Sequence, residues 1–336
     1  MENTTFNPSN HSSLTSRNNT FMGTIFLDGY LTISICIIGV ISNGAVAYII
    51  ITCKQFQAST YIFLCSMSIA DVVALFSVAL HVISMIIVEN NVAYTAFLEF
   101  GCKAYGYMLQ VGFTVSTHSL AIISVDRYFS ICRNASLNRK YALNTNRKIK
   151  LTIIVTWSYA LVSSLPNLFL TSMHNNLYRV CDFMSHSQRY VAIYLLVYYT
   201  ISYILPLCVM TIMYIKIISY LRSTVANTTI QGQALEHSRK RIVKIINMMI
   251  IVTVTYMITS LPHVTLIFIA AVHGISLTTY MQYANPNIGF AFAIALVLSQ
   301  ISWIQNSFVY LICNRPFRNE LLQCCNSKHS RILLHR

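Results

Sequence analysis

The chain has 336 residues, of which 55% are hydrophobic and only 10% are charged. A soluble domain carries about 25% charged residues, so this composition excludes an ordinary soluble protein and predicts an integral membrane protein. The net charge is +14, but the basic residues lie between apolar runs and not on one face. We therefore attribute them to membrane orientation and predict no nucleic-acid partner.

Seven apolar runs follow one another along the chain. A helix needs roughly 20 apolar residues to cross a bilayer, and its backbone must satisfy its own hydrogen bonds there. The runs predict helices over about 25–51, 59–88, 98–132, 149–172, 189–221, 241–273 and 286–312. We predict an all-α membrane protein: a seven-transmembrane helix bundle over 25–313, with a polar segment at 1–24 and a tail at 314–336. The polar segment lacks the features of a signal peptide, so the first run is expected to remain as an anchor.

Lysine and arginine indicate which way the chain crosses the membrane. Almost all of them lie in or beside the connections after runs one, three and five, or in the tail; the exceptions are Arg17, Lys103, Arg179 and Arg189. The positive-inside rule then places the N-terminus outside and the C-terminus in the cytosol. Glycosylation sequons at Asn3, Asn10 and Asn18 agree with that orientation.

Polar side chains from four runs fall at one depth of the predicted bundle. Asp71 lies ~18 Å from the inner end of its run, and a carboxylate there is costly unless it is paired or hydrated. By the same rise of about 1.5 Å per residue, Asn43, Ser116 and Asn306 reach a similar depth. The four residues predict a buried polar cluster whose oxygens could hold a cation. The alternative is a protonated Asp71 in a purely structural network.

The third run has a notable residue pattern at each end. Of the ten cysteines, only Cys102 and Cys181 face the predicted outer side, so one disulfide is expected, the alternative being two free thiols. The inner end reads VDRYF, with Asp126 beside Arg127. A cation is favoured at a helix C-terminus and an arginine can reach water there, so simple anchoring at the interface is the alternative to a functional role.

The fifth and sixth runs each contain a proline, Pro206 and Pro262. A proline inside a helix removes one hydrogen bond and permits a kink, so we predict two bent helices. The alternative is a packing adjustment alone, because proline is common in membrane helices.

The tail begins NRPFRNELLQCC. Phe317, Leu321 and Leu322 fall on one face, which predicts a short amphipathic helix lying on the inner leaflet, in contact with lipid. Cys324 and Cys325 follow it as predicted palmitoylation sites, and the alternative is two unmodified thiols.

Over about residues 25–325, the chain resembles the rhodopsin-like (class A) G-protein-coupled receptors. Motifs match in chain order: SNGAV at Asn43, SIADVV at Asp71, Cys102, VDRYF at Arg127, Trp157, Pro206 with Tyr214, Pro262, and NSFVY at Asn306 and Tyr310. The resemblance implies a plasma-membrane receptor that takes an extracellular ligand between its helices, with a heterotrimeric G protein and arrestin as partners.

The resemblance also implies roles for particular residues. The activation switch would comprise Asp126, Arg127, Tyr128, Tyr214 and Tyr310, with Arg127 in contact with the G protein. The family's sodium pocket matches Asp71, Ser116 and Asn306, and its disulfide matches Cys102 and Cys181.

Three positions depart from the family pattern. Ser260 stands where the family usually has tryptophan, and Ser307 stands where proline usually follows the asparagine. Many members also carry an acid low on the sixth helix, where this chain has basic residues at 239–241 and 244. We therefore expect a less firmly restrained resting state and measurable basal activity.

Two positions that match ligand-binding residues of the family exclude two classes of ligand. Leu109, followed by Gln110, replaces the aspartate of amine receptors, and Gln300 replaces the retinal-binding lysine. No carboxylate can pair a monoamine and no Schiff base can form there. With Tyr107 and His263, these residues predict an amphipathic, mostly uncharged pocket, although the sequence favours His263 as a core histidine over a ligand contact.

We favour a peptide ligand, and the alternatives are a small-molecule or lipid ligand or a constitutive or non-signalling member. A seven-helix transporter is disfavoured because Asp71 is the only deep acid and no inverted repeat appears. We predict no enzymatic activity, because the sequence shows no metal-ligand cluster, nucleophile–base pair or phosphate loop.

Overall fold

The structure is a computed structural model that describes residues 9–88, 95–132, 143, 145–174, 180–182, 188–227, 233–273, 286–313 and 317–319. Its long helices are α1 (Ser9–Thr52), α2 (Ser59–Val88), α3 (Thr95–Ile131), α5 (Asn146–Ser164), α7 (Gln188–Tyr199), α8 (Leu205–Asn227), α9 (Gln233–His273) and α11 (Pro286–Cys313). Shorter elements are the 3₁₀ turn η1 (Lys54–Phe56), α6 (Asn167–Leu170), the π-helical turn η3 (Thr200–Ile204), and strands β1 (Ser172–His174) and β2 (Val180–Asp182).

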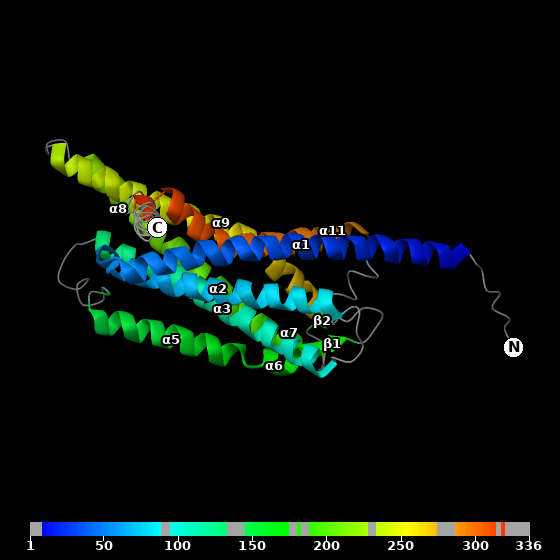
Figure 1. Ribbon diagram of the computed structural model, residues 1–336. Helices are drawn as coiled ribbons and strands as arrows, with labels where there is room; N and C mark the ends of the chain where they lie inside the picture. Colours follow the sequence, from blue (N-terminus) through cyan, green and yellow to red (C-terminus); the bar gives the residue numbers. More distant parts are fainter. Residues whose placement is uncertain are drawn as a thin grey trace, which may run out of the picture.

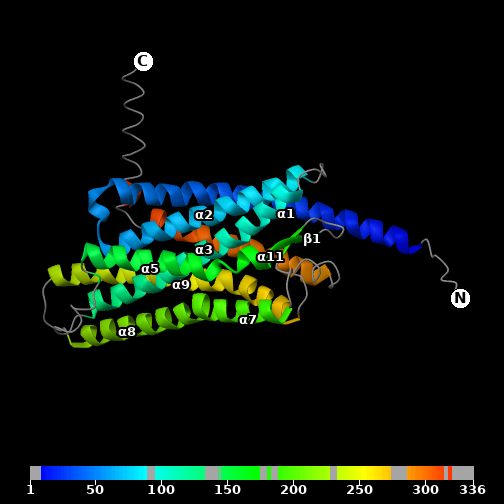
Figure 2. The ribbon, with the colours of Figure 1, turned by 90° about the horizontal axis from the view of Figure 1, so that it is seen from below.

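Seven helical segments are long and apolar enough to cross a membrane, which confirms the predicted number of spans. The helices run side by side along one direction, and the β-hairpin lies at the same end of the bundle as the start of α1 (Figure 1). Viewed from below, α1 and α2 form one side and α7 and α8 the other, with α3 between them (Figure 2). We call the two ends the Cys102 end and the Arg127 end, after the residues at either end of α3.

Four helices differ from the predicted runs, and one of them, α9, begins at Gln233, before the predicted start at 241. The first helix begins at Ser9, directly after Pro8, although its apolar span is Gly29–Thr52, because a helix continues at little cost once it has formed. The fourth run is broken at Pro166, which lacks a backbone N–H, so α6 is separate and strand β1 follows at Ser172. The fifth run contains the π turn η3 just before Pro206, where the missing proline N–H disturbs regular pairing.

The core is built around α3, which packs against α2, α5 and α8. Trp157 of α5 donates from Nε1 to Ser66 Oγ of α2 at 2.9 Å, and this hydrogen bond joins α5 to α2. At Gly112, α2 and α3 lie close together. A Cβ added there would lie 2.7 Å from Ala74 Cβ and 3.0 Å from the Ala70 carbonyl oxygen.

We expect Gly112→Ala to destabilise the bundle. Neither obstacle is the end of a flexible side chain, so α2 and α3 must separate, and overpacking of this kind costs about 1–3 kcal/mol. The measurement is surface expression together with the apparent melting temperature in detergent. Gly101→Ala in the same helix is the matched control, because a Cβ there meets nothing within 4 Å. Equal behaviour of the two variants would contradict the close packing described for α2 and α3.

The described part of the tail is helical and anchored by an aromatic cluster. Phe317 is fully buried, while Arg318 and Asn319 are exposed. The Phe317 ring lies 4.4 Å from that of Phe56 in η1 and 5.7 Å from that of Tyr61 in α2, between ring centroids. This one-sided burial agrees with the predicted amphipathic helix over the three residues the structure describes, and its remainder lies outside the described residues.

Candidate functional site

The Arg127 end holds an ion pair within a small hydrogen-bond network. Arg127 Nη2 lies 2.8 Å from Asp126 Oδ2. The same oxygen accepts hydrogen bonds from Ser59 Oγ at 2.8 Å and Thr60 Oγ1 at 3.2 Å, both at the start of α2. Asp126 is 3% exposed, and among the described residues Arg127 Nε has no hydrogen-bond partner. The pair is therefore tied to α2 through the carboxylate, while the guanidinium keeps unused donor capacity.

Tyrosines from neighbouring helices surround this ion pair. Tyr214 OH of α8 lies 3.1 Å from Thr253 Oγ1 of α9. Tyr214 and Tyr310 are both buried near Arg127. Tyr128 lies under a cation, since Lys216 Nζ is 5.6 Å from its ring centroid. The five residues predicted as a switch thus gather at this end of the bundle.

The polar residues at mid-depth come together only in part. Ser116 Oγ of α3 donates to Asp71 Oδ1 of α2 at 2.5 Å, whereas Asn306 Nδ2 of α11 lies 3.7 Å from Met67 Sδ of α2. Asn43 Nδ2 instead donates to the carbonyl oxygens of Gly39 and Trp303, each at 3.0 Å. Within the described residues, Asn43 therefore joins α1 to α11 and does not bond Asp71.

Several buried oxygens of this layer have no hydrogen-bond partner among the described residues. They are Asp71 Oδ2, Asn306 Oδ1, Asn43 Oδ1 and Ser68 Oγ. Such groups are costly to bury unsatisfied, and water or an ion commonly completes them. One carboxylate with amide and hydroxyl oxygens is a donor set that suits a hard cation. The layer therefore fits the predicted Na⁺ site in its chemistry.

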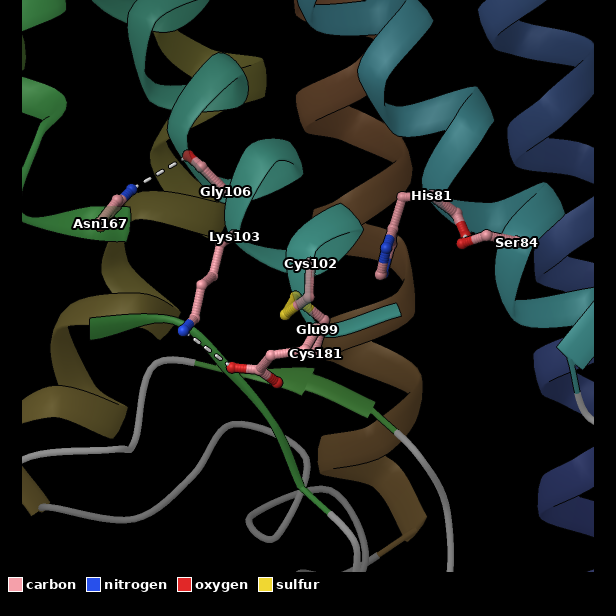
Figure 3. The surroundings of a disulfide bond; sticks show 8 residues. All are labelled: His81, Ser84, Glu99, Cys102, Lys103, Gly106, Asn167 and Cys181. Atoms are coloured by element: carbon pink, nitrogen blue, oxygen red, sulfur yellow. Dashed lines mark hydrogen bonds and ion pairs between the residues drawn. A yellow bond between two sulfur atoms is a disulfide. The ribbon is translucent and has the colours of Figure 1, made fainter. Parts of the chain in front are cut away.

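At the opposite end, Cys102 and Cys181 form a disulfide that closes a separation of 79 residues (Figure 3). Cys181 lies in β2, where it is opposite Met173 of β1 in an antiparallel register. Asn167 Nδ2 donates to the Gly106 carbonyl at 3.0 Å and ties the segment before β1 to α3. Cysteine position alone predicted the disulfide, but the hairpin was missed because strands of three residues leave little sequence periodicity.

We expect Cys102→Ser and Cys181→Ser to weaken the fold equally, and the double variant to be no worse than either. Each single change removes the same bond, and a native disulfide typically contributes about 2–4 kcal/mol. The measurement is the apparent melting temperature with surface expression. Cys208→Ser, at an exposed free cysteine of α8, is the control. Additive losses in the double variant would show that the two cysteines act separately.

The residues predicted to line a ligand pocket lie near the Cys102 end but face different neighbours. Gln110 is buried, and its Oε1 accepts from Tyr194 OH at 2.8 Å. Tyr107 OH instead donates to the Leu161 carbonyl of α5 at 3.2 Å. Gln300 Nε2 lies 3.3 Å from Thr32 Oγ1 of α1. Leu109 and His263 are half-buried.

Hydrogen bonds and one cation–π contact also involve residues that the sequence analysis did not select. Ser59 and Thr60 hold Asp126, and Lys216 covers Tyr128. Thr253 and Tyr256 of α9 bond to other helices. The sequence does contain a pattern that could have predicted the α9 contacts: hydroxyl residues at 253, 256 and 260 recur at helical spacing inside an apolar run.

Some predicted sites lie outside the described residues. Asn3, Cys324 and Cys325 are among them, and for Asn10 and Asn18 only the helical backbone is described. Glycosylation and palmitoylation at these positions therefore stay predictions.

The fold and the site define a class: a seven-helix membrane protein with a polar layer at mid-depth, a disulfide at one end and an arginine–carboxylate pair at the other. The family model for the 7 transmembrane receptor (rhodopsin family) matches residues 42–310. The chain belongs to this family.

Three relatives show how far the likeness extends. The chain is 24% identical over 329 residues to neuropeptide FF receptor 2 of Mus musculus, covering 90% of this chain and 74% of that receptor. It is 25% identical over 221 residues to the thyrotropin-releasing hormone receptor of Gallus gallus, covering 64% and 54%. It is 23% identical over 318 residues to the GQ-coupled rhodopsin of Mizuhopecten yessoensis, covering 89% and 60%.

Proposed function

We propose that this chain is a plasma-membrane G-protein-coupled receptor that transduces an extracellular peptide to heterotrimeric G proteins. The observation that carries the proposal is the Arg127 end, where a guanidinium with unused donors lies among Asp126, Tyr214 and Tyr310. The distribution of basic residues supports an extracellular Cys102 end and a cytosolic Arg127 end.

Two considerations favour a peptide as the ligand. Two of the three relatives described above are named as receptors for a neuropeptide and a hormone. The third is a rhodopsin, but Gln300 stands in this chain where the retinal lysine is expected, so retinal cannot be held by a Schiff base. A β-hairpin tethered at the Cys102 end also offers backbone groups, which suit recognition of an extended peptide.

In the proposed mechanism, ligand binding near Gln110 and His263 shifts a two-state equilibrium toward an open form. The ligand must bind the open form better than the resting form, since only differential affinity moves the equilibrium. Pro262 lets α9 bend, and its movement separates Thr253 from Tyr214. Arg127 then leaves Asp126 and contacts the G protein.

Na⁺ would favour the resting form through Asp71, with Ser116 and Asn306 as further oxygen donors. The ion would supply a positive charge that the buried carboxylate lacks among the described residues.

We propose in addition that arrestin binds the activated form and that palmitoyl groups on Cys324 and Cys325 attach the tail to the inner leaflet.

We expect Na⁺ to raise the apparent melting temperature of the ligand-free receptor, and Asp71→Asn to abolish that response. A ligand that binds only the folded resting state stabilises it by about 2.7 kcal/mol at one hundred times its dissociation constant. The measurement replaces choline chloride with NaCl at constant ionic strength. Glu99→Gln, which neutralises a carboxylate paired with Lys103 at 3.1 Å, should keep the full response. A persistent Na⁺ effect in Asp71→Asn would remove Asp71 from the site.

A peptide library screen on cells that express the chain tests the proposed ligand class, with G-protein biosensors as the readout. We expect at least one peptide to produce a saturable response that mock-transfected cells lack. A response to lipids or small organic molecules alone would overturn the peptide assignment while keeping the receptor.

A further inference from the structure

The middle of α3 is enclosed by its neighbours except at one residue. Of residues 110–121, all are buried but His118, which is half-buried. Toward the Arg127 end, Ile122, Val125 and Phe129 continue a line of half-buried residues at helical spacing. This line marks the side of α3 that reaches the bilayer, and its first member is a histidine where hydrocarbon favours an apolar side chain.

Two further helical elements lie beside His118. Its ring centroid is 5.2 Å from that of Tyr159 in α5, and the Tyr159 hydroxyl lies 3.5 Å from Ser202 Oγ in η3. Val155 and Val162 lie on the same face of α5 as Tyr159 and are each more than half exposed. The histidine therefore lies at an apolar surface, and we call His118 with Tyr159 and Ser202 the His118 face.

One nitrogen of the His118 ring has no partner among the described residues. His118 Nδ1 lies 2.9 Å from the Thr114 carbonyl oxygen, which can only accept a hydrogen bond, so Nδ1 carries the hydrogen. In the neutral ring Nε2 is then an acceptor. The single hydrogen bond of the ring within the described residues is the one from Nδ1, so Nε2 is left for a donor from outside the bundle.

The depth of His118 limits what that donor can be. Its span, Phe97–Ile131, has residue 114 at its middle, so His118 lies ~6 Å from the middle along the helix. The surface of the hydrocarbon core lies about 15 Å from the bilayer centre. Water and lipid headgroups remain at that surface, so the donor must belong to a molecule or a helix within the hydrocarbon.

The width of the His118 face favours a slender molecule over another helix. A helix with its side chains is about 10 Å across. Only one residue of α3 is accessible between 110 and 121, and α5 and α8 both pack against α3. A partner helix would rest on α5 and α8 before its side chains reached the ring of His118, whereas a hydroxyl group on a narrow apolar body can reach it.

We propose that the His118 face binds a sterol that carries a hydroxyl group on its side chain, and that this hydroxyl donates to His118 Nε2. The ring hydroxyl of a sterol stays at the bilayer surface, so it does not reach His118, while the end of the side chain lies near the bilayer centre. The sterol body would lie against Tyr159 and the exposed valines of α5. This is a second ligand site, outside the proposed peptide pocket and independent of G-protein coupling.

The test measures binding of tritiated 25-hydroxycholesterol to the purified chain in nanodiscs of phosphatidylcholine alone. His118→Phe keeps a ring against Tyr159 but removes the acceptor, so it should weaken binding roughly three- to tenfold, as expected for one neutral hydrogen bond. His81→Phe is the matched control. It replaces another histidine that stacks on a tyrosine, Tyr105, at 4.2 Å between centroids, and it should bind like wild type.

A comparison of ligands gives a readout that does not depend on a variant. Cholesterol lacks the side-chain hydroxyl, so it should bind wild type more weakly than 25-hydroxycholesterol and should not respond to His118→Phe. Equal affinity of wild type for the two sterols, or equal affinity of wild type and His118→Phe for 25-hydroxycholesterol, would overturn the proposal.

Two further results would assign the His118 face to another occupant. Tighter binding of 12-hydroxystearic acid than of 25-hydroxycholesterol, lost in His118→Phe, would replace the sterol by a hydroxylated acyl chain. Self-association of the chain that His118→Phe abolishes, without any change in sterol binding, would replace it by a helix of a second copy.

Discussion

Asp126→Asn is expected to raise ligand-independent signalling roughly five- to tenfold, since a loss of about 1.4 kcal/mol from the resting form changes its ratio to the active form tenfold. Asp126 Oδ2 accepts from Arg127, Ser59 and Thr60, so one buried oxygen links α3 to α2 and holds the guanidinium. Asparagine can still accept from the two hydroxyl groups, but it cannot neutralise Arg127. The ion pair is therefore the main interaction lost.

The measurement is second-messenger output at matched surface expression. Glu99→Gln is the control, because it removes the charge of another α3 carboxylate whose paired cation, Lys103, lies at the Cys102 end. Ser59→Ala with Thr60→Ala should give a smaller increase, since the ion pair then remains. A baseline unchanged by Asp126→Asn would show that the restraint on Arg127 lies elsewhere.

Arg127→Ala is expected to reduce both basal and ligand-stimulated signalling to the level of mock-transfected cells. The change removes the resting ion pair, which alone would favour activation, but it also removes the group proposed to contact the G protein. Arg127→Lys should keep only part of the signal, because an ammonium lacks the planar fork of a guanidinium. Arg189→Ala, at an exposed arginine of α7, should signal normally. Signalling above wild type in Arg127→Ala would show that the arginine restrains the receptor without transmitting the signal.

The spans were predictable because a long apolar run in a bilayer must form a helix to satisfy its backbone hydrogen bonds. The predicted run 59–88 coincides with α2 (Ser59–Val88), and 286–312 differs from α11 by one residue. Breaks inside runs were less visible: Pro166 divides the fourth span, and a π turn lies just before Pro206. A proline in the sequence does not by itself tell whether a membrane helix bends, ends or takes a π turn. The hairpin was also not predictable, because its two strands of three residues, five residues apart in the chain, are too short to show a periodic pattern.

In the site, likewise, contacts between neighbours in the sequence were predictable, and contacts between different helices were not. Asp126 beside Arg127 is local, and the sequence predicted that these side chains could meet at a helix end. Their attachment to Ser59 and Thr60 depends on the approach of α2, which no local pattern encodes. The expectation of weak restraint followed from the missing acid on the sixth helix.

The central claim is that Arg127 transmits activation to a G protein. The most direct test compares Asp126→Asn with Asp126→Asn/Arg127→Ala across a panel of Gα biosensors, at equal surface expression and without added ligand. We predict that Asp126→Asn activates at least one Gα subtype above mock-transfected cells and that the second substitution returns the signal to the mock level. Activation of no subtype by Asp126→Asn, or equal activation by the two variants, would contradict this claim.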